Sequence, residues 1–436
     1  MRGALLVGIL LVASLPLAAT ARAAASEVHL SLAPDGYTVT FESPTPLANA
    51  SISFAGTHPG TSVATASPAP AGDSDSVYTA RLPSDATSYT VEGRTFAIHR
   101  ASSPDALRVV VMADVGSGPD SWRMWALAQK QAPDLILIAG DVSYANGDQQ
   151  KWDEWFAHVE PLAATVPVMT ALGNHETYCS PDGVKLNGCA RETFEYLEHF
   201  HMPAKDQLYY SFDLGPAHFT SLDTEAYHPS DPTAPSADKA AQNAFLAQSL
   251  RDAGGAWNIV FFHRPLYSSN VHEDDVSDPA AKADWQPILD AGGASLVLNG
   301  HAHAYERSHP LRGDAVVSSG NTVRAGAGTF YVTTGGGGRS LYTEFTEPPA
   351  WSATRTAQYE LVVLDITKDD IVGRALRADG SLLDDFAVYR GATPPSLQET
   401  RAPSAASAPG HAIPALAPLV AALAVVATAR AWRRAR

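Results

Sequence analysis

Five apolar stretches of the sequence each lead into residues that can bind a metal ion. The stretches cover residues 107–112, 135–139, 167–172, 259–262 and 296–298. The residues that follow them are Asp114, Asp141 with Tyr144, Asn174 with His175, His263, and His301 with His303. Oxygen and nitrogen donors without a thiolate suit borderline transition metals, and a phenolate favours a hard trivalent ion such as ferric iron. Any one of these residues alone is more often a cap or a satisfied structural side chain, whereas five successive strand ends indicate a metal site.

The elements that must position these residues belong to a layered α/β domain. Unbroken apolar runs are typical of strands buried on both faces, and ligands of such sheets collect beyond the carboxyl ends of the strands. Helix-like stretches at residues 121–130 and 238–252 lie between the runs. Further strands are predicted at residues 329–333, 359–366, 371–377 and 386–389. Residues 103–391 are therefore predicted to be the catalytic domain.

The segment before this domain has a different pattern. Short runs of alternating polar and apolar residues occur at 28–32, 37–41, 78–82 and 89–91, separated by Pro, Gly, Asp and Ser. Alternation with a period of two and frequent turns is typical of a small all-β sandwich. Residues 26–102 are predicted to form that sandwich, and they contain no cluster of His, Asp or Glu that could carry chemistry.

The five motifs together resemble those of one family. The sequences Asp114-Val-Gly, Gly-Asp141-Val-Ser-Tyr144, Gly-Asn174-His175-Glu, Val-Phe-Phe-His263 and Gly-His301-Ala-His303 occur in the order found in purple acid phosphatases. These belong to the calcineurin-like metallophosphoesterase superfamily. The resemblance implies a fibronectin type III-like β-sandwich followed by an αββα metallophosphoesterase domain. Tyr144 distinguishes this branch from most of its superfamily relatives.

The resemblance also implies two metal ions and their ligands. One ion would be held by Asp114, Asp141, Tyr144 and His303, which is the ferric position in the family. The other, a divalent Fe, Zn or Mn, would be held by Asp141, Asn174, His263 and His301. Two cations about 3.5–4 Å apart repel each other, so a shared carboxylate, here Asp141, and a bridging hydroxide are needed to hold them. Charge transfer from the Tyr144 phenolate would colour the protein purple.

Outer-shell histidines of the family match His175 and His272, which would contact phosphate and protonate the leaving group. His272 lies in a polar loop and could instead be a solvated surface residue. The next position carries Glu273, where some relatives have another histidine, and this departure puts the pH optimum and substrate preference in doubt. Glu176 and Arg307 are expected to orient neighbours. The glycines at 335–338 are interpreted as a close-approach turn without a catalytic role.

Composition and the termini suggest an exported protein. A net charge of −16 opposes non-specific attraction to nucleic acid or to an anionic membrane. Residues 1–25 are predicted to be a signal peptide, and residues 392–411 a Pro/Ala/Ser-rich linker. Residues 412–436 combine an apolar run with arginines, as in a transmembrane anchor or a processed sorting signal. Cys179 and Cys189 either close a short disulfide loop or remain free thiols.

These observations predict an exported acid phosphatase that cleaves small phosphate monoesters by attack of a metal-bound hydroxide. The same dinuclear site could serve a phosphodiesterase or nucleotide pyrophosphatase, because only the pocket loops discriminate between these substrates. A catalytically silent surface-binding module is the third alternative, and the complete ligand set argues against it.

Overall fold

The structure is a computed structural model, and it describes residues 25–44, 46–66, 76–177, 191–204, 208–228, 237–272 and 277–397. Several predicted features lie outside these residues. They are the signal peptide, Cys179, Cys189, Glu273 and the segment 412–436. Within the described residues, no helix is both long enough and apolar enough to cross a bilayer.

The N-terminal strands form two antiparallel sheets that share one core. One sheet has the order β1 (Ser26–Ala33), β2 (Gly36–Ser43), β6 (Ser76–Pro83) and β5 (Thr65–Ala66). The other has the order β4 (Gly60–Val63), β3 (Ser51–Ala55), β7 (Ser88–Val91) and β8 (Arg94–Ala97). Val39 and Phe41 of the first sheet and Ile52 and Tyr89 of the second belong to the same buried cluster. The predicted all-β sandwich is confirmed, and the proposed limit at residues 102/103 lies between β8 and β9.

Two seven-stranded sheets form the domain that follows. The first sheet has the order β11 (Val168–Thr170), β10 (Leu135–Ile138), β9 (Ala106–Met112), β22 (Glu360–Thr367), β23 (Asp370–Arg377), β24 (Leu382–Tyr389) and β19 (Thr322–Arg324). The second has the order β12 (Tyr210–Leu214), β13 (Ala217–Ser221), β14 (Trp257–Phe261), β15 (Leu296–Asn299), β20 (Phe330–Thr334), β16 (Tyr305–Ser308) and β21 (Ser352–Thr356). A small hairpin pairs β17 (Leu311–Arg312) with β18 (Ala315–Val316).

Strands β9, β10 and β11 run parallel in the first sheet, and β13, β14, β15 and β20 run parallel in the second. The carboxyl ends of the neighbouring parallel strands in each sheet therefore meet at one edge. Val110 and Leu361 of the first sheet lie in the same buried cluster as Phe261 and Leu298 of the second. The two sheets thus pack against each other.

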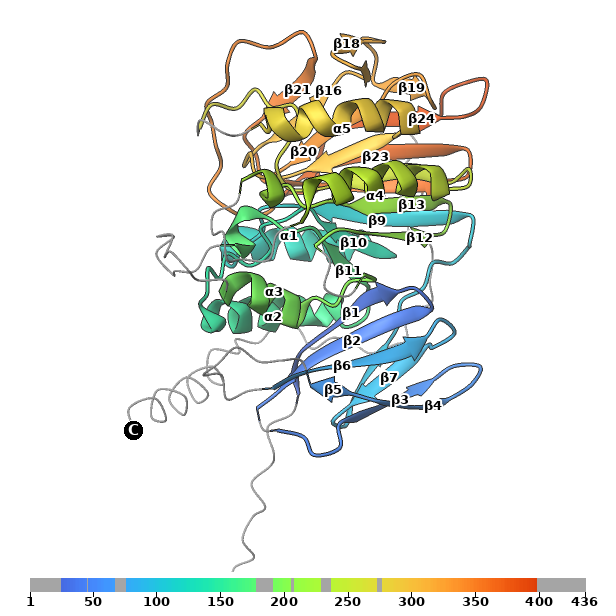
Figure 1. The fold of residues 1–436 in the computed structure, drawn as a ribbon, viewed down its shortest axis with the longest axis vertical. Coiled ribbons are helices and arrows are strands. Elements are labelled where there is room, and N and C mark those ends of the chain that lie inside the picture. The colour runs from blue at the N-terminus through green and yellow to red at the C-terminus, as the bar shows by residue number, and fades with distance from the viewer. Residues whose placement is uncertain are drawn as a thin grey trace, which may run out of the picture. The chain divides into compact units, whose positions relative to one another are not determined.

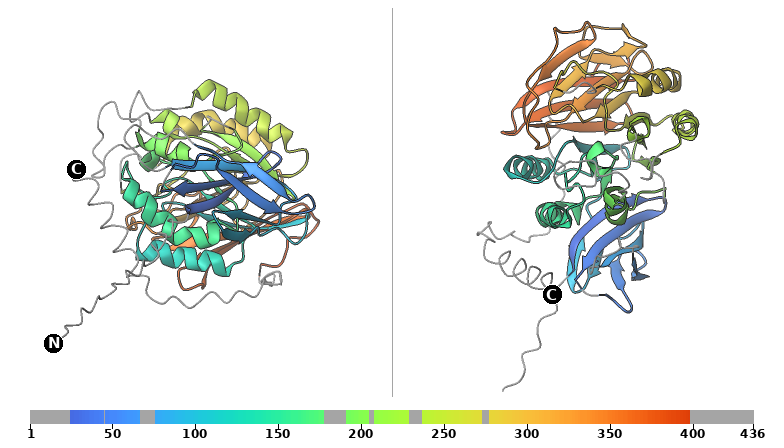
Figure 2. Two further views of the ribbon diagram at one scale, coloured as in Figure 1. Left: turned by 90° about the horizontal axis from the view of Figure 1, so that it is seen from below. Right: turned by 60° about the vertical axis from the view of Figure 1, so that its left-hand side comes forward.

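Helices cover the outer faces of both sheets. Those of the domain are α1 (Pro119–Lys130), α2 (Gln149–Ala163), α3 (Arg191–His199), α4 (Lys239–Asp252) and α5 (Pro279–Gly292), with short 3₁₀ turns η1 (Asn174–Glu176) and η2 (Glu225–Tyr227). Figure 1 shows α4 and α5 side by side across the second sheet, where Leu246 and Trp285 pack on Val260. The right-hand view of Figure 2 places α1 and α2 on the opposite side. The predicted αββα layering is confirmed.

The sequence marks the helix ends. In α5 the Asp278 carboxylate accepts from the N–H groups of Ala280 and Ala281, and the helix ends at Gly293 with φ 67°. In α4 the Asp238 carboxylate caps the first turn in the same way, at 2.7 Å from the Ala241 nitrogen. Both predicted helices, 121–130 and 238–252, match α1 and α4 to within two residues.

Candidate metal centre

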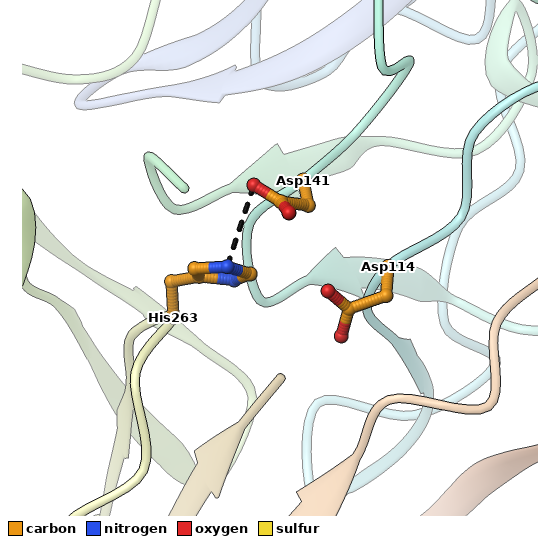
Figure 3. A group of neighbouring side chains, drawn as sticks. All are labelled: Asp114, Asp141 and His263. Carbon is orange, nitrogen blue, oxygen red and sulfur yellow. Dashed lines mark ion pairs between the residues drawn. The ribbon is translucent and has the colours of Figure 1, made fainter. Parts of the chain in front are cut away.

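The predicted ligands come together beyond the carboxyl ends of five strands. Asp114 follows β9, Asp141 and Tyr144 follow β10, Asn174 follows β11, His263 follows β14, and His301 and His303 follow β15. All seven side chains are buried, none more than 8% exposed as a residue. Figure 3 shows Asp114, Asp141 and His263 pointing toward one another, with a ligand atom of each within 4.8 Å of the others.

Three of these donors form a first group. The Tyr144 hydroxyl lies 3.1 Å from Oδ1 of Asp114 and 2.8 Å from Nε2 of His303. The same carboxylate oxygen is 3.4 Å from the His303 nitrogen. Burial, together with the Asp114 carboxylate, raises the pKa of Tyr144 well above its usual value. A bound cation would oppose this rise and favour the phenolate form.

Four donors form a second group around Nε2 of His263. That nitrogen lies 3.0 Å from Oδ1 of Asn174, 3.3 Å from Oδ1 of Asp141 and 3.2 Å from Nδ1 of His301. Burial disfavours the charged form of His263, but the Asp141 carboxylate outweighs this effect and raises the histidine pKa.

The donor set fits two metal ions. Metal–ligand distances of about 2.0–2.2 Å place neighbouring ligand atoms of one ion about 3 Å apart. The separations within each group are of this size. Asp141 and Asp114 lie where the two groups meet. Carboxylate, phenol, amide and imidazole donors together suit borderline or hard transition metals.

The backbone is strained at four of the seven ligands. Asp114, Asp141, Tyr144 and His301 have φ values of 55°, 53°, 56° and 68°, in the left-handed region that side chains rarely adopt. Such conformations persist where the surroundings impose them, and they concentrate at functional sites. All four of these residues belong to the two donor groups.

Hydrogen bonds to backbone carbonyls orient two of the imidazoles. Nδ1–H of His263 donates to the Ala139 carbonyl at 3.0 Å, and Nδ1–H of His303 donates to the Ser340 carbonyl at 2.8 Å. Each bond fixes the tautomer and leaves Nε2 to face the neighbouring donors, as in known metal–histidine pairs.

The domain with these strand ends is similar to a known protein family. Residues 107–305 match the calcineurin-like phosphoesterase family. This chain contains a calcineurin-like phosphoesterase domain. The family match covers the strand ends from Asp114 to His303.

Relatives of this phosphoesterase domain carry three kinds of name. An Arabidopsis thaliana protein named probable inactive purple acid phosphatase 27 is 29% identical over 59% of this chain and 43% of its own length. A Hordeum vulgare protein named nucleotide pyrophosphatase/phosphodiesterase is 29% identical over 59% of this chain and 72% of its own. Mouse acid phosphatase type 7 is 29% identical over 65% of this chain and 67% of its own length. This chain thus spans less than half the length of the first relative.

The fold has a solved counterpart. The purple acid phosphatase PPD1 of yellow lupin aligns with a TM-score of 0.71 at 22% identity, covering 86% of this chain and 78% of its own. The predicted resemblance to purple acid phosphatases and the predicted succession of a β-sandwich and an α/β phosphoesterase domain are confirmed by these comparisons.

Glu176 supports the loops that carry Asp141 and Asn174. Its carboxylate accepts from the N–H groups of Asp141, Val142 and Gly173, all at 2.8–2.9 Å. Burial, together with the Asp141 carboxylate, raises the pKa of Glu176 to about 8. The expected orienting role of Glu176 agrees with these contacts. The Arg307 guanidinium pairs with Asp384 at 2.6 Å.

The two predicted proton donors occupy different surroundings. His175 is half-buried, its Nδ1–H donates to Oδ1 of Asn146 at 2.7 Å, and its ring lies 4.0 Å from that of Tyr144. Burial lowers the pKa of His175 to about 4. His272 is exposed, and its ring stacks at 3.8 Å on Tyr342, which stacks at 4.0 Å on His303. His272 therefore lies one ring away from a predicted metal ligand.

The segment after β20 approaches the site closely, as its glycines predict, and it also brings two residues that the sequence did not indicate. Gly337 donates to the Ala113 carbonyl, Arg339 to that of Asp114, and Tyr342 to that of His303, at 2.9–3.1 Å. A Cβ on Gly337 would collide with the Ala113 carbonyl, which explains the run of glycines as a close approach. The glycines indicated the close approach, but nothing in the sequence indicated that Arg339 and Tyr342 would follow it into the site.

A buried ion pair beside His301 was not predicted either. The Arg264 guanidinium donates to both carboxylate oxygens of Glu225, at 2.7 and 3.2 Å, and one of its nitrogens lies 3.0 Å from Nε2 of His301. Both residues are buried. Arg264 follows His263 directly in the sequence, so its place near the site could have been predicted. Its partner Glu225 is 39 residues away, and their contact is visible only in the folded structure.

Proposed function

We propose that this chain is an exported acid phosphatase that hydrolyses small phosphate monoesters with two metal ions. The observation that carries the proposal is the convergence of the seven donors in two adjacent groups, four of them on strained backbone. We assign Asp114, Asp141, Tyr144 and His303 to a ferric ion. We assign Asp141, Asn174, His263 and His301 to a divalent Fe, Zn or Mn ion.

The chain's own residues prepare the site for this chemistry. Bound at these positions, two cations would acidify water and act as Lewis acids toward the phosphoryl group. Asp141 would hold both ions, and Glu176 would fix Asp141 and the neighbouring loop through three backbone hydrogen bonds. The buried donors exclude bulk water, which strengthens electrostatic interactions with a bound phosphate.

His175 and His272 are proposed to contact the phosphate and to transfer a proton to the leaving group. The Asn146 carbonyl oxygen holds Nδ1–H of His175, which leaves Nε2 turned toward the site, 3.9 Å from Oδ2 of Asp141. His272 stands at the rim, supported by Tyr342. Two histidines at different depths could serve the phosphoryl oxygens and the leaving oxygen separately.

Monoester preference is tested by comparing hydrolysis of p-nitrophenyl phosphate with that of its bis ester. The barley relative's name favours the second candidate function, a phosphodiesterase or nucleotide pyrophosphatase on the same site. We expect kcat/KM to be higher for the monoester. Faster hydrolysis of the diester would refute the monoester preference and favour the phosphodiesterase function.

The proposal that the site turns over is tested by metal analysis and by one variant. The Arabidopsis relative named inactive makes a silent binding module the alternative, but all seven donors are present here. The purified full chain should contain about two metals, and His263→Ala should abolish hydrolysis while the fold persists by circular dichroism. Unchanged turnover in His263→Ala would refute the enzymatic role.

The metal assignment and the export signal are proposals of the same kind. A ferric ion on Tyr144 predicts a broad visible absorption band that Tyr144→Phe removes. Export and anchoring rest on residues 1–25 and 412–436 of the sequence, and they are tested by mass spectrometry of the protein from culture medium and membranes.

A further inference from the structure

A guanidinium group lies on the face of the tyrosine that is proposed to bind iron. Cζ of Arg339 is 4.3 Å from the centroid of the Tyr144 ring. The Arg339 N–H donates to the Asp114 carbonyl at 3.1 Å, which ties the backbone of this residue to the first donor group. Gly116 lets the side chain pass, because a Cβ there would lie 2.6 Å from Cδ of Arg339.

No carboxylate of the described residues forms an ion pair with Arg339, although Asp114 and Asp141 lie nearby. Arg339 is half-buried, and its Nε is buried without a hydrogen-bond partner in the described part of the chain. A guanidinium on an aromatic face is attracted by the ring, and this attraction increases when the ring carries negative charge. The Tyr144 ring is therefore one of the groups on which the charge of Arg339 acts, and it is the one that the guanidinium covers.

We propose that Arg339 tunes the ferric–phenolate bond of Tyr144 and so sets the colour of the centre. This inference rests on the proposed function, because it requires iron on Tyr144. Visible absorption of a ferric phenolate moves electron density from the phenolate ring to the iron. A cation on the ring face stabilises the negative ring, so the transition requires more energy and lies at shorter wavelength.

The test compares visible spectra of iron-loaded full-length variants at equal iron content. Arg339→Met removes the charge at similar length, and we expect its absorption maximum at longer wavelength than that of the wild type. Arg339→Lys keeps a cation and should stay close to the wild-type maximum. Arg390→Met is the matched control, because Arg390 lies 3.8 Å from the centroid of the Trp257 ring, in another part of the domain, and should leave the band unmoved.

The outcomes separate this inference from the function on which it rests. A wild-type band that Tyr144→Phe removes, with an unmoved band in iron-loaded Arg339→Met, overturns the role of Arg339 alone. A raised KM in Arg339→Met with an unmoved band would make Arg339 a substrate-binding residue, and this also overturns the proposal. A wild-type protein without the band refutes both proposals. If Arg339→Met fails to retain iron, Arg339→Gln replaces it, and an unmoved band there is equally decisive.

Discussion

The ion pair between Arg264 and Glu225 should stabilise both the fold and the second donor group. The side chains are 9% and 4% exposed, so a charge left behind by removal of its partner stays out of water. Breaking a buried pair in this way costs about 3–5 kcal/mol. Replacing both residues removes both charges and costs much less. We expect Arg264→Met and Glu225→Gln each to lower the free energy of unfolding by about 3–5 kcal/mol.

The double variant should lose less than the two single losses combined, by about 3 kcal/mol. Urea unfolding of the metal-free protein, followed by fluorescence, measures all four forms of the cycle. If the loss in the double variant equals the sum of the two single losses within about 0.5 kcal/mol, the two charges do not interact and the reasoning is refuted.

The same pair has a second consequence, for metal binding. A guanidinium nitrogen of Arg264 lies 3.0 Å from Nε2 of His301, so Arg264 packs against this ligand. Loss of a residue that positions a ligand typically weakens metal binding 10–100-fold. Arg264→Met should therefore weaken binding of one metal by about this factor, measured by competition with a chelator. Arg374→Met is the control, because Arg374 pairs with Asp365 in β22 and β23, away from the ligands. Equal losses of metal affinity in the two variants would contradict a specific role for Arg264.

Three further outcomes are expected. Glu176→Gln should weaken metal binding about 10–100-fold by calorimetric titration, because an amide cannot accept all three backbone N–H groups; unaltered affinity would argue against this support. Burial raises the pKa of Glu360 from 4.5 to about 8, so between these pH values the folded state binds a proton that the unfolded state has lost. The free energy of unfolding should therefore fall as pH rises through this window, by at most about 1.4 kcal/mol per pH unit from this group. Glu360→Gln should flatten the decline in urea denaturation, and an identical pH profile would exclude the effect. Gly337→Ala should displace the backbone from Ala113 and reduce metal affinity, whereas Gly320→Ala, which meets nothing closer than 3.6 Å, should not; similar effects of both would rule out a specific close approach.

The strand ends could be predicted from sequence because each motif is local. An apolar run followed by Asp114 or His263 contains both the strand and the ligand, so no long-range information is needed. The sequence did not indicate that β9 and β14 belong to different sheets, since both read as strands buried on two faces. It also gave no sign of the Arg264–Glu225 contact or of Arg339 on Tyr144, because these depend on loops that meet only in the folded chain.

The two sheets contribute different chemistry to the site. Every proposed oxygen ligand, from Asp114 to Asn174, follows a strand of the first sheet, whereas every proposed histidine ligand follows a strand of the second. Each proposed ion therefore requires donors from both sheets. Hard oxygen donors on one side and imidazoles on the other mean that metal binding must hold the sheet edges together, since neither sheet alone offers a complete set. Metal affinity and the packing of the two sheets are thus linked, and any change that shifts one sheet against the other should weaken both metals together.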